Sequence, residues 1–275
     1  MEKYFAAAIQ LDSQEKKKEN LRIVAEFIDE AAAKKAKLIV LPETMSYIGS
    51  DEGIRQNAEP IGGLTCQLLC EKAKQHGIWL NGGSFHEFVE GQTRVYNTSL
   101  MIDPRGEISA IYRKIHLYDV EVASGPSYKE SNTIIPGNEI VVAETNLGII
   151  GMSICYDIRF AEMYRIMALK GAQVVLVPAA FSLVTGRDHW ETVLRTRAIE
   201  NGFYLIAPNQ MGKKVTFAMQ GKSVIIDPWG NVIAKASDYP GVIIAEINYD
   251  YMESIRSQVP SLKNRRADVY AKYEM

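Results

Sequence analysis

The chain has 275 residues, of which 47% are hydrophobic and 23% charged, with a formal net charge of −2. This balance is typical of a soluble globular enzyme and excludes a disordered chain or a protein that binds nucleic acid through a basic patch. The odd number of cysteines, three, argues against a disulfide scaffold and favours a reducing compartment. No stretch approaches the roughly 20 apolar residues of a membrane helix, and no basic segment precedes the short apolar stretch 4–11. We therefore expect a cytoplasmic protein with no membrane or nucleic-acid partner.

Apolar strands and amphipathic helices alternate along the chain. The first part predicts strands at 4–11, 37–41, 78–85, 94–103 and 107–115, with helices at 15–36 and 64–77. The second part predicts strands at 148–155, 172–180, 203–209, 222–227 and 242–247, with helices at 161–171 and 187–202. The continuous apolar run KLIVL at 37–41 is typical of a strand buried on both faces.

Two segments of the first part have weak counterparts in the second. AKKAKLIVLPE (33–43) resembles ALKGAQVVLVPAA (168–180), and NTSLMIDPRGEI (97–108) resembles GKSVIIDPWGNV (221–232). Two related halves favour two sheets packed face to face with helices outside, an α/β fold. Because no Pro/Gly/Ser-rich linker divides the chain, we expect residues 1–275 to form a single domain. The polar tail 258–275 is either an arm on a partner subunit or a frayed end.

Three chemically reactive side chains follow apolar strands directly: Glu43 in LIVLPE, Lys114 in IYRKIHLYD and Cys155 in GMSICYD. Because the carboxyl ends of strands form the ligand crevice of α/β sheets, these side chains are expected to converge. A carboxylate can take the proton of a thiol, and an ammonium can stabilise the thiolate and the oxyanion that follows. The set therefore suits acyl transfer from an amide, and the chain lacks the glycine-rich motifs of dinucleotide or phosphate binding.

Each residue alone has a structural alternative. Cys155 is compatible with core packing, Glu43 with a helix cap or ion pair, and Lys114 with the surface. His116, two residues after Lys114, is the one histidine expected beside the site as a substrate contact, and a structural role for it is also open. Cys66 and Cys70 share one helix face without further metal ligands nearby, so core packing is expected and no metal site.

The blocks LPE, YRKIHLYD and GMSICYDIRFAE resemble the three signature blocks of the nitrilase superfamily, the carbon–nitrogen hydrolases. The resemblance extends over nearly the whole chain, including FSLVTGRDHWETVLRTRAIEN and GKSVIIDPWGNVIA. It implies a four-layer αββα sandwich, which agrees with the two related halves. It also implies that no cofactor is needed, since every step is acid–base and covalent catalysis by side chains.

The resemblance assigns roles to individual residues. It makes Glu43 the general base, Lys114 the electrostatic stabiliser and Cys155 the nucleophile. A further carboxylate of the family, which positions the lysine and the substrate, matches Glu130 in YKESN. The oxyanion would be held by Lys114 and the backbone N–H of Tyr156.

The sequence Cys-Tyr-Asp at the nucleophile resembles the amidase branches, and within them the Nit subgroup of omega-amidases and deaminated glutathione amidases. In that subgroup an arginine binds the substrate carboxylate, and Arg159 matches it. Phe181 and Thr185 match residues lining the same pocket, and Tyr47 is a further candidate for its wall. The loop 120–131 is expected to border the pocket mouth and to influence the accepted acyl-chain length.

The resemblance therefore predicts an amidase for small linear omega-amides of dicarboxylates, of the 2-oxoglutaramate or deaminated glutathione type. The alternatives are a hydrolase of N-carbamoyl amino acids or carbamoylputrescine, and a catalytically silent scaffold or redox sensor built on the same fold. The family usually forms dimers or larger homo-oligomers. The helix around 188–201 and the C-terminal arm are the expected contacts.

Overall fold

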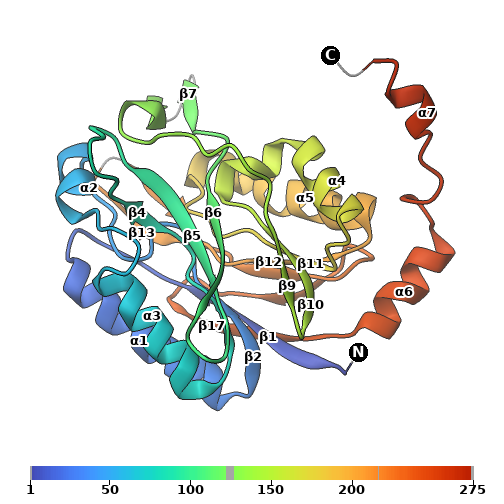
Figure 1. The fold of residues 1–275 in the computed structure, drawn as a ribbon, viewed down its shortest axis with the longest axis horizontal. Coiled ribbons are helices and arrows are strands. Elements are labelled where there is room, and N and C mark those ends of the chain that lie inside the picture. Colours follow the sequence, from blue (N-terminus) through green and yellow to red (C-terminus); the bar gives the residue numbers. More distant parts are fainter. Residues whose placement is uncertain (1, 122–126, 216, 274–275) are drawn as a thin grey trace.

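The computed structural model describes residues 2–121, 127–215 and 217–273, and two β-sheets lie at its centre (Figure 1). The first sheet has the order β17-β1-β2-β3-β5-β4, with β6 also paired to β5. Its strands are β1 (Tyr4–Gln10), β2 (Ala36–Val40), β3 (Trp79–Asn81), β4 (Phe85–Glu87), β5 (Tyr96–Ile102), β6 (Ile108–Arg113) and β17 (Gly241–Ile247).

The second sheet has the order β16-β15-β12-β11-β10-β9. Its strands are β9 (Val142–Thr145), β10 (Gly148–Met152), β11 (Val174–Leu176), β12 (Tyr204–Ala207), β15 (Val224–Ile226) and β16 (Val232–Lys235). Two small hairpins stand apart from the sheets: β7 (Asp119–Glu121) with β8 (Ser127–Lys129), and β13 (Met211–Lys213) with β14 (Ala218–Gln220).

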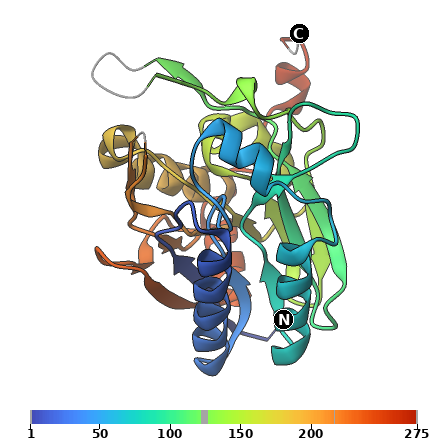
Figure 2. The same ribbon diagram turned by 90° about the vertical axis from the view of Figure 1, so that its left-hand side faces the viewer.

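Helices cover the outer faces of both sheets. Figure 2 shows α1 and α3, in dark blue and teal, beside one another outside the first sheet. The second sheet is covered by α4 and α5. The helices are α1 (Lys17–Ala33), α2 (Asp51–Asn57), α3 (Leu64–His76), α4 (Ala161–Leu169), α5 (Leu183–Asn201), α6 (Tyr249–Gln258) and α7 (Ala267–Tyr270), with 3-10 turns η1 (Glu130–Asn132) and η2 (Cys155–Arg159).

The alternation of side chains along β1 shows why the layers form. Ala6 and Ala8 pack into the core between the two sheets, whereas Ala7 and Ile9 pack against the outer helices. Successive side chains of a strand point to opposite faces, so a strand with apolar residues at every position needs cover on both sides. The predicted αββα sandwich is confirmed.

The second pair of counterparts in the sequence forms the same structure twice. β5 and β6 are joined by a turn in which Asp103 accepts the backbone N–H groups of Arg105 and Glu107. β15 and β16 are joined by a turn in which Asp227 accepts those of Trp229 and Asn231. Each Asp-Pro turn thus closes a hairpin at the corresponding place in its own sheet.

Some element bounds differ from the prediction. The expected strand 78–85 is two strands, because Gly83 has a φ of 60° and approaches the backbone of Leu41 and Pro42 too closely for a side chain. The expected strand 148–155 ends at Met152, and the helix expected at 187–202 already begins at Leu183, where Ser182 caps it. The pattern analysis did not predict α2, α6, α7 or the short strands β7, β8, β9, β13 and β14.

The C-terminal segment runs away from the sheets after α6 and ends in α7 (Figure 1). Most of its described residues are exposed, including Val259 and Tyr273. Among the described helices, none combines the length and the apolar character needed to cross a bilayer.

Candidate active site

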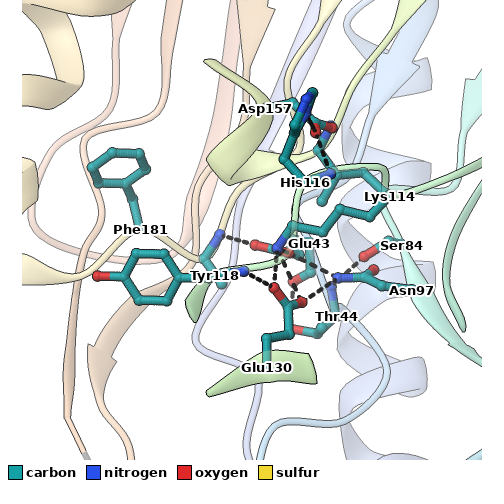
Figure 3. A network of polar contacts seen from close by, with 12 residues as sticks. Glu43, Thr44, Ser84, Asn97, Lys114, His116, Tyr118, Glu130, Asp157 and Phe181 are labelled. Atoms are coloured by element: carbon teal, nitrogen blue, oxygen red, sulfur yellow. Dashed lines mark hydrogen bonds and ion pairs between the residues drawn. The ribbon is translucent and has the colours of Figure 1, made fainter. Parts of the chain in front are cut away.

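The strand-end residues predicted from the sequence converge in space. Glu43 follows β2, Lys114 follows β6, and Glu130 begins η1 after the β7–β8 hairpin. The Lys114 Nζ lies 2.9 Å from Glu43 Oε1 and 2.9 Å from Glu130 Oε2, so one ammonium bridges two carboxylates (Figure 3). All three side chains are almost fully buried. The cluster places one lysine between two carboxyl groups, almost out of contact with bulk water.

Glu43 is held by donors on three sides. Its Oε1 also accepts the side-chain amide of Asn97 at 2.9 Å, and its Oε2 accepts the backbone N–H of Ala180 at 2.8 Å. Thr44, the next residue, has a left-handed φ of 49° and donates its N–H to Ser84 Oγ (Figure 3). These contacts fix the direction in which the carboxylate points.

Glu130 and Lys114 influence each other's protonation. Burial raises the pKa of Glu130, an effect that Lys114 opposes and the nearby Glu43 reinforces. Burial alone would lower the pKa of Lys114, but the two carboxylates outweigh it and raise the pKa well above its usual value. Lys114 is therefore a cation in the folded protein around neutral pH.

Cys155 begins η2 in a strained backbone conformation. Its φ of 47° is left-handed, which costs a non-glycine residue about 1–3 kcal/mol and is typical of functional sites. Burial, reinforced by the nearby Glu43 and opposed by Lys114, raises the pKa of the Cys155 thiol well above its usual value. The thiol is therefore neutral near pH 7 and needs a base to become a nucleophile. Glu43 is the carboxylate beside it.

The backbone N–H of Tyr156, the expected oxyanion donor, lies in the first turn of η2. First-turn N–H groups of a helix have no partner inside the helix. This N–H is therefore free to donate to the carbonyl oxygen of a substrate whose carbonyl carbon is attacked by Cys155.

These residues border a cavity of about 550 Å³, and we call it the large cavity. Glu43, Lys114, Glu130 and Cys155 lie in its wall. Tyr47, predicted as a wall residue, lies there too, together with His86 and Tyr128, which the sequence analysis did not select. Its volume is within the range of about 300–1,000 Å³ found for small-molecule sites.

A second hollow of about 20 Å³, the small recess, adjoins the large cavity at Cys155. Its further walls are Tyr118, Tyr156, Ala180, Phe181, Ser182 and Thr185. The hydroxyls of Tyr118 and Thr185 lie near each other, and among the described residues neither bonds any other group. Buried hydroxyls with unused hydrogen-bonding capacity suit a polar ligand group.

Arg159 lies at the rim of the small recess, not in its wall. Its guanidinium carbon is 5.6 Å from the ring centroid of Tyr156 and 5.5 Å from that of Phe181, and its nitrogens lie 3.3 and 3.4 Å from His189 Nδ1. The aromatic rings hold the cation on the side where Phe181 and Thr185 lie. The structure thus brings the three residues of the predicted carboxylate pocket to one side of Cys155.

His116 does not point where the sequence analysis expected. It lies in the wall of neither hollow. Its Nδ1 is 2.8 Å from the buried Asp157 carboxylate, and its ring stacks on Phe160 at a centroid distance of 3.6 Å. The chain has left β6 at Arg113, so strand alternation no longer applies at His116. Figure 3 shows His116 and Asp157 set apart from the Glu43–Lys114–Glu130 cluster.

Sequence reasoning missed several residues that organise the site. Asn97, on β5, and the backbone of Ala180, after β11, both hold Glu43. Asn97 begins a run of three polar residues, 97–99, in a buried strand, and this was the available signal. Ala180 acts through its main chain, which leaves no mark in the sequence. In the expected loop 120–131, residues 122–126 lie outside the described residues.

No cluster of three or more potential metal ligands occurs in residues 2–121, 127–215 and 217–273. The cysteines Cys66, Cys70 and Cys155, all within these ranges, are free thiols. Cys66 belongs to the core between α3 and the first sheet, and Cys70 packs partly buried against it. Core packing, as expected, describes both residues.

Comparisons with known proteins agree with this geometry. The family model described as carbon-nitrogen hydrolase matches residues 5–257. A deaminated glutathione amidase of Synechocystis sp. is 41% identical over 272 residues, covering 96% of this chain and 99% of that protein. The omega-amidase NIT2 of Homo sapiens is 37% identical over 272 residues, covering 98% of each.

Solved structures show the same fold. The Caenorhabditis elegans NitFhit protein matches with a TM-score of 0.90 and 34% identity, over 98% of this chain and 66% of that one. Saccharomyces cerevisiae Nit3, described as a member of branch 10 of the nitrilase superfamily, matches with a TM-score of 0.87 and 32% identity, over 96% of this chain and 97% of that one.

Proposed function

Since the chain belongs to the carbon–nitrogen hydrolase family and is a hydrolase of carbon–nitrogen bonds other than peptide bonds, we propose that it cleaves linear omega-amides of dicarboxylates through a thioester on Cys155. The observation that carries the proposal is the bridging of Glu43 and Glu130 by Lys114 in a cavity that Cys155 also lines. The relatives named as amidases for such substrates support the choice of acyl group.

The reaction begins with proton transfer. Glu43 takes the proton of the neutral Cys155 thiol, and the thiolate attacks the amide carbon. Negative charge develops on the amide oxygen, where the Lys114 ammonium and the Tyr156 N–H stabilise it. Glu43 then gives the proton to the leaving nitrogen as the carbon–nitrogen bond breaks, which leaves a thioester and a free amine or ammonia.

Hydrolysis of the thioester uses the same groups in reverse. Glu43 takes a proton from a water molecule that attacks the thioester carbon, and the carbon–sulfur bond breaks. The proton returns to the Cys155 sulfur, so the acid is released and the enzyme is restored. Glu130 stays bound to Lys114 throughout and keeps the ammonium charged and oriented.

We assign the distal carboxylate of the acyl chain to the small recess and its rim. At about 20 Å³ the recess has room for about one water-sized group, so the rest of the chain extends into the adjoining large cavity. Phe181 and Thr185 line the recess, and Arg159 at its rim supplies a planar pair of donors for the distal carboxylate. The hydroxyls of Tyr118 and Thr185 would donate to the keto group or the carboxylate. This arrangement disfavours carbamoylputrescine, because its distal ammonium would face the cation of Arg159.

We assign the leaving group to the large cavity, because Glu43, which protonates the leaving nitrogen, lines the large cavity and not the small recess. The cavity of about 550 Å³ has room for the acyl chain and for a leaving group larger than ammonia. This observation favours an N-substituted amide of the deaminated glutathione type over 2-oxoglutaramate, and makes the latter the second candidate.

The test is release of product from both amides by the purified protein. We expect turnover of at least one of them, with a higher kcat/KM for deaminated glutathione, and loss of turnover below detection in Cys155→Ala. Cys70→Ala, which removes a thiol far from the cavity, is the matched control and should keep its turnover. Failure of the wild type on both substrates would sink the proposal and shift weight to a carbamoyl hydrolase or a silent scaffold.

We further propose that the protein is a homodimer in the cytoplasm. Support for a dimer comes from exposed apolar residues on α4 and α5 and at the start of the C-terminal arm, namely Ile166, Leu169, Ile199 and Val259. Support for the compartment comes from the three free thiols. Light scattering should give twice the chain mass, and Ile199→Asp should lower it. A monomeric wild type would reject the dimer, and cell fractionation tests the compartment.

A further inference from the structure

One buried carboxylate joins the two chain segments that carry Lys114 and Cys155. Asp157, with no exposed surface, accepts four hydrogen bonds. Its Oδ1 accepts the backbone N–H of His116 at 3.2 Å and lies 2.8 Å from the His116 Nδ1. Its Oδ2 accepts the Tyr112 hydroxyl at 2.6 Å and the backbone N–H of Ile154 at 2.8 Å.

These contacts span both reactive residues. Lys114 lies between Tyr112 and His116 in the chain, and Cys155 lies between Ile154 and Asp157. The Asp157 N–H also donates to the Ile154 carbonyl at 3.1 Å, which closes the turn around Cys155. The left-handed backbone of Cys155 is a conformation that persists only where its surroundings hold it. Asp157 supplies such a hold from within the same turn.

We propose that Asp157 is a positioning residue that locks the Cys155 turn to the end of β6, so that the thiol and the Lys114 ammonium keep their register. The proposal rests on the proposed function only for its effect on turnover. It also gives His116 a role: the ring stacks on Phe160 and directs Nδ1 to the carboxylate. His116 acts through Asp157 and does not touch the substrate.

An amide in place of the carboxylate cannot make the same four contacts. Asparagine would turn its NH₂ group toward either the His116 pair or the Tyr112 and Ile154 pair, and both pairs are donors. The hydroxyl of Tyr112 can rotate and the ring of His116 can change tautomer, but a backbone N–H cannot. One backbone N–H, of His116 or of Ile154, is therefore left unpaired in Asp157→Asn. Either loss detaches one of the two joined segments.

The experiment compares Asp157→Asn with Tyr164→Phe. Tyr164 is an equally buried neighbour whose hydroxyl lies 2.9 Å from Ser153 Oγ and does not bond Asp157. We measure urea unfolding, kcat and KM for the amide that is turned over, and the rate of Cys155 alkylation by iodoacetamide against pH. Peptide mass mapping separates Cys155 from Cys66 and Cys70. The alkylation needs no amide substrate.

For Asp157→Asn we expect kcat to fall about 10²-fold with little change in KM, and the alkylation midpoint to move to higher pH, because a displaced Lys114 stabilises the thiolate less. Tyr164→Phe should lower the free energy of unfolding but leave kcat and the alkylation midpoint unchanged. The proposal is overturned if the two variants match in kcat and midpoint, or if the loss in Asp157→Asn lies in KM alone.

A second variant covers the case in which Asp157→Asn does not fold. His116→Ala removes one of the four contacts but keeps the backbone N–H, so a loss of kcat smaller than tenfold and a small rise in the alkylation midpoint are expected. No change in either quantity would overturn the proposal. If the alkylation midpoint shifts in a variant while the wild type cleaves neither tested amide, the positioning role of Asp157 is supported and the proposed function is rejected.

Discussion

Lys114 and Lys214 both lie in the wall of the large cavity, and both have side chains only about 2% exposed, yet their pKa values shift in opposite directions. Burial lowers the pKa of Lys214, and Asp12, which is partly in water, opposes this effect without cancelling it. Two buried carboxylates raise the pKa of Lys114 instead. Similar side-chain exposure thus goes with opposite pKa shifts, and the number and burial of the neighbouring carboxylates decide the direction.

A third base in the same wall completes the series. Burial, followed by the charges of Lys17 and Lys114, lowers the pKa of His86, on β4, to about 4, and no carboxylate of the described residues forms an ion pair with it. Among the described residues, Lys114 thus has two carboxylate partners, Lys214 has one and His86 has none. Only Lys114 is held firmly as a cation, and it is the one beside Cys155 in the site.

The largest effect is expected from removing the Lys114 charge. Lys114→Met leaves Glu43 and Glu130 buried without a counter-charge, so the free energy of unfolding should fall by about 3–5 kcal/mol and kcat by at least about 10²-fold. Urea unfolding measures the free energy of unfolding, and turnover of the cleaved amide measures kcat. A stable and active variant would show that the carboxylates do not depend on the lysine.

The second effect concerns acid stability. The pKa of His86 is about 4 in the folded protein against about 6.5 when unfolded, so the unfolded chain takes up its proton first. This contribution to stability is fully present above about pH 6.5 and is lost as the pH falls toward 4, by about 3 kcal/mol in total.

His86→Gln should flatten the loss between pH 6.5 and 4, as followed by urea unfolding at several pH values. His189→Gln, at an exposed position, serves as the control and should keep the wild-type slope. An unchanged slope in His86→Gln would mean that His86 is charged in the folded protein.

The smallest effect is expected at the other lysine. Lys214→Met removes a charge that burial already disfavours and leaves a partly exposed Asp12, so the free energy of unfolding should change by no more than about 1 kcal/mol. Urea unfolding under identical conditions compares this change in the free energy of unfolding with the change in Lys114→Met. Equal losses in the two variants would break the distinction between the lysines.

Much of the fold could be predicted from the sequence, because its signals are local. The apolar runs around β1 and β2 and the helix ending at Gly77 are patterns of neighbouring residues, and the Asp-Pro turns at Asp103 and Asp227 are closed by bonds within five residues. α6 was missed although Tyr249, Met252 and Ile255 are buried at helical spacing, because its polar face dominates the composition.

The sequence by itself determined the layers, the strand ends and, through the family resemblance, Glu43, Lys114, Cys155 and Glu130 as the residues to examine. Only the tertiary structure decided that His116 turns to Asp157, that Asn97 and the Ala180 N–H hold Glu43, and that two hollows meet at Cys155. The physical reason is that these contacts join residues far apart in the chain, and several run through the backbone. Local pattern carries hydrophobic period and turn chemistry, whereas charge, pKa and pocket shape depend on which neighbours the packed sheets bring within a few ångströms.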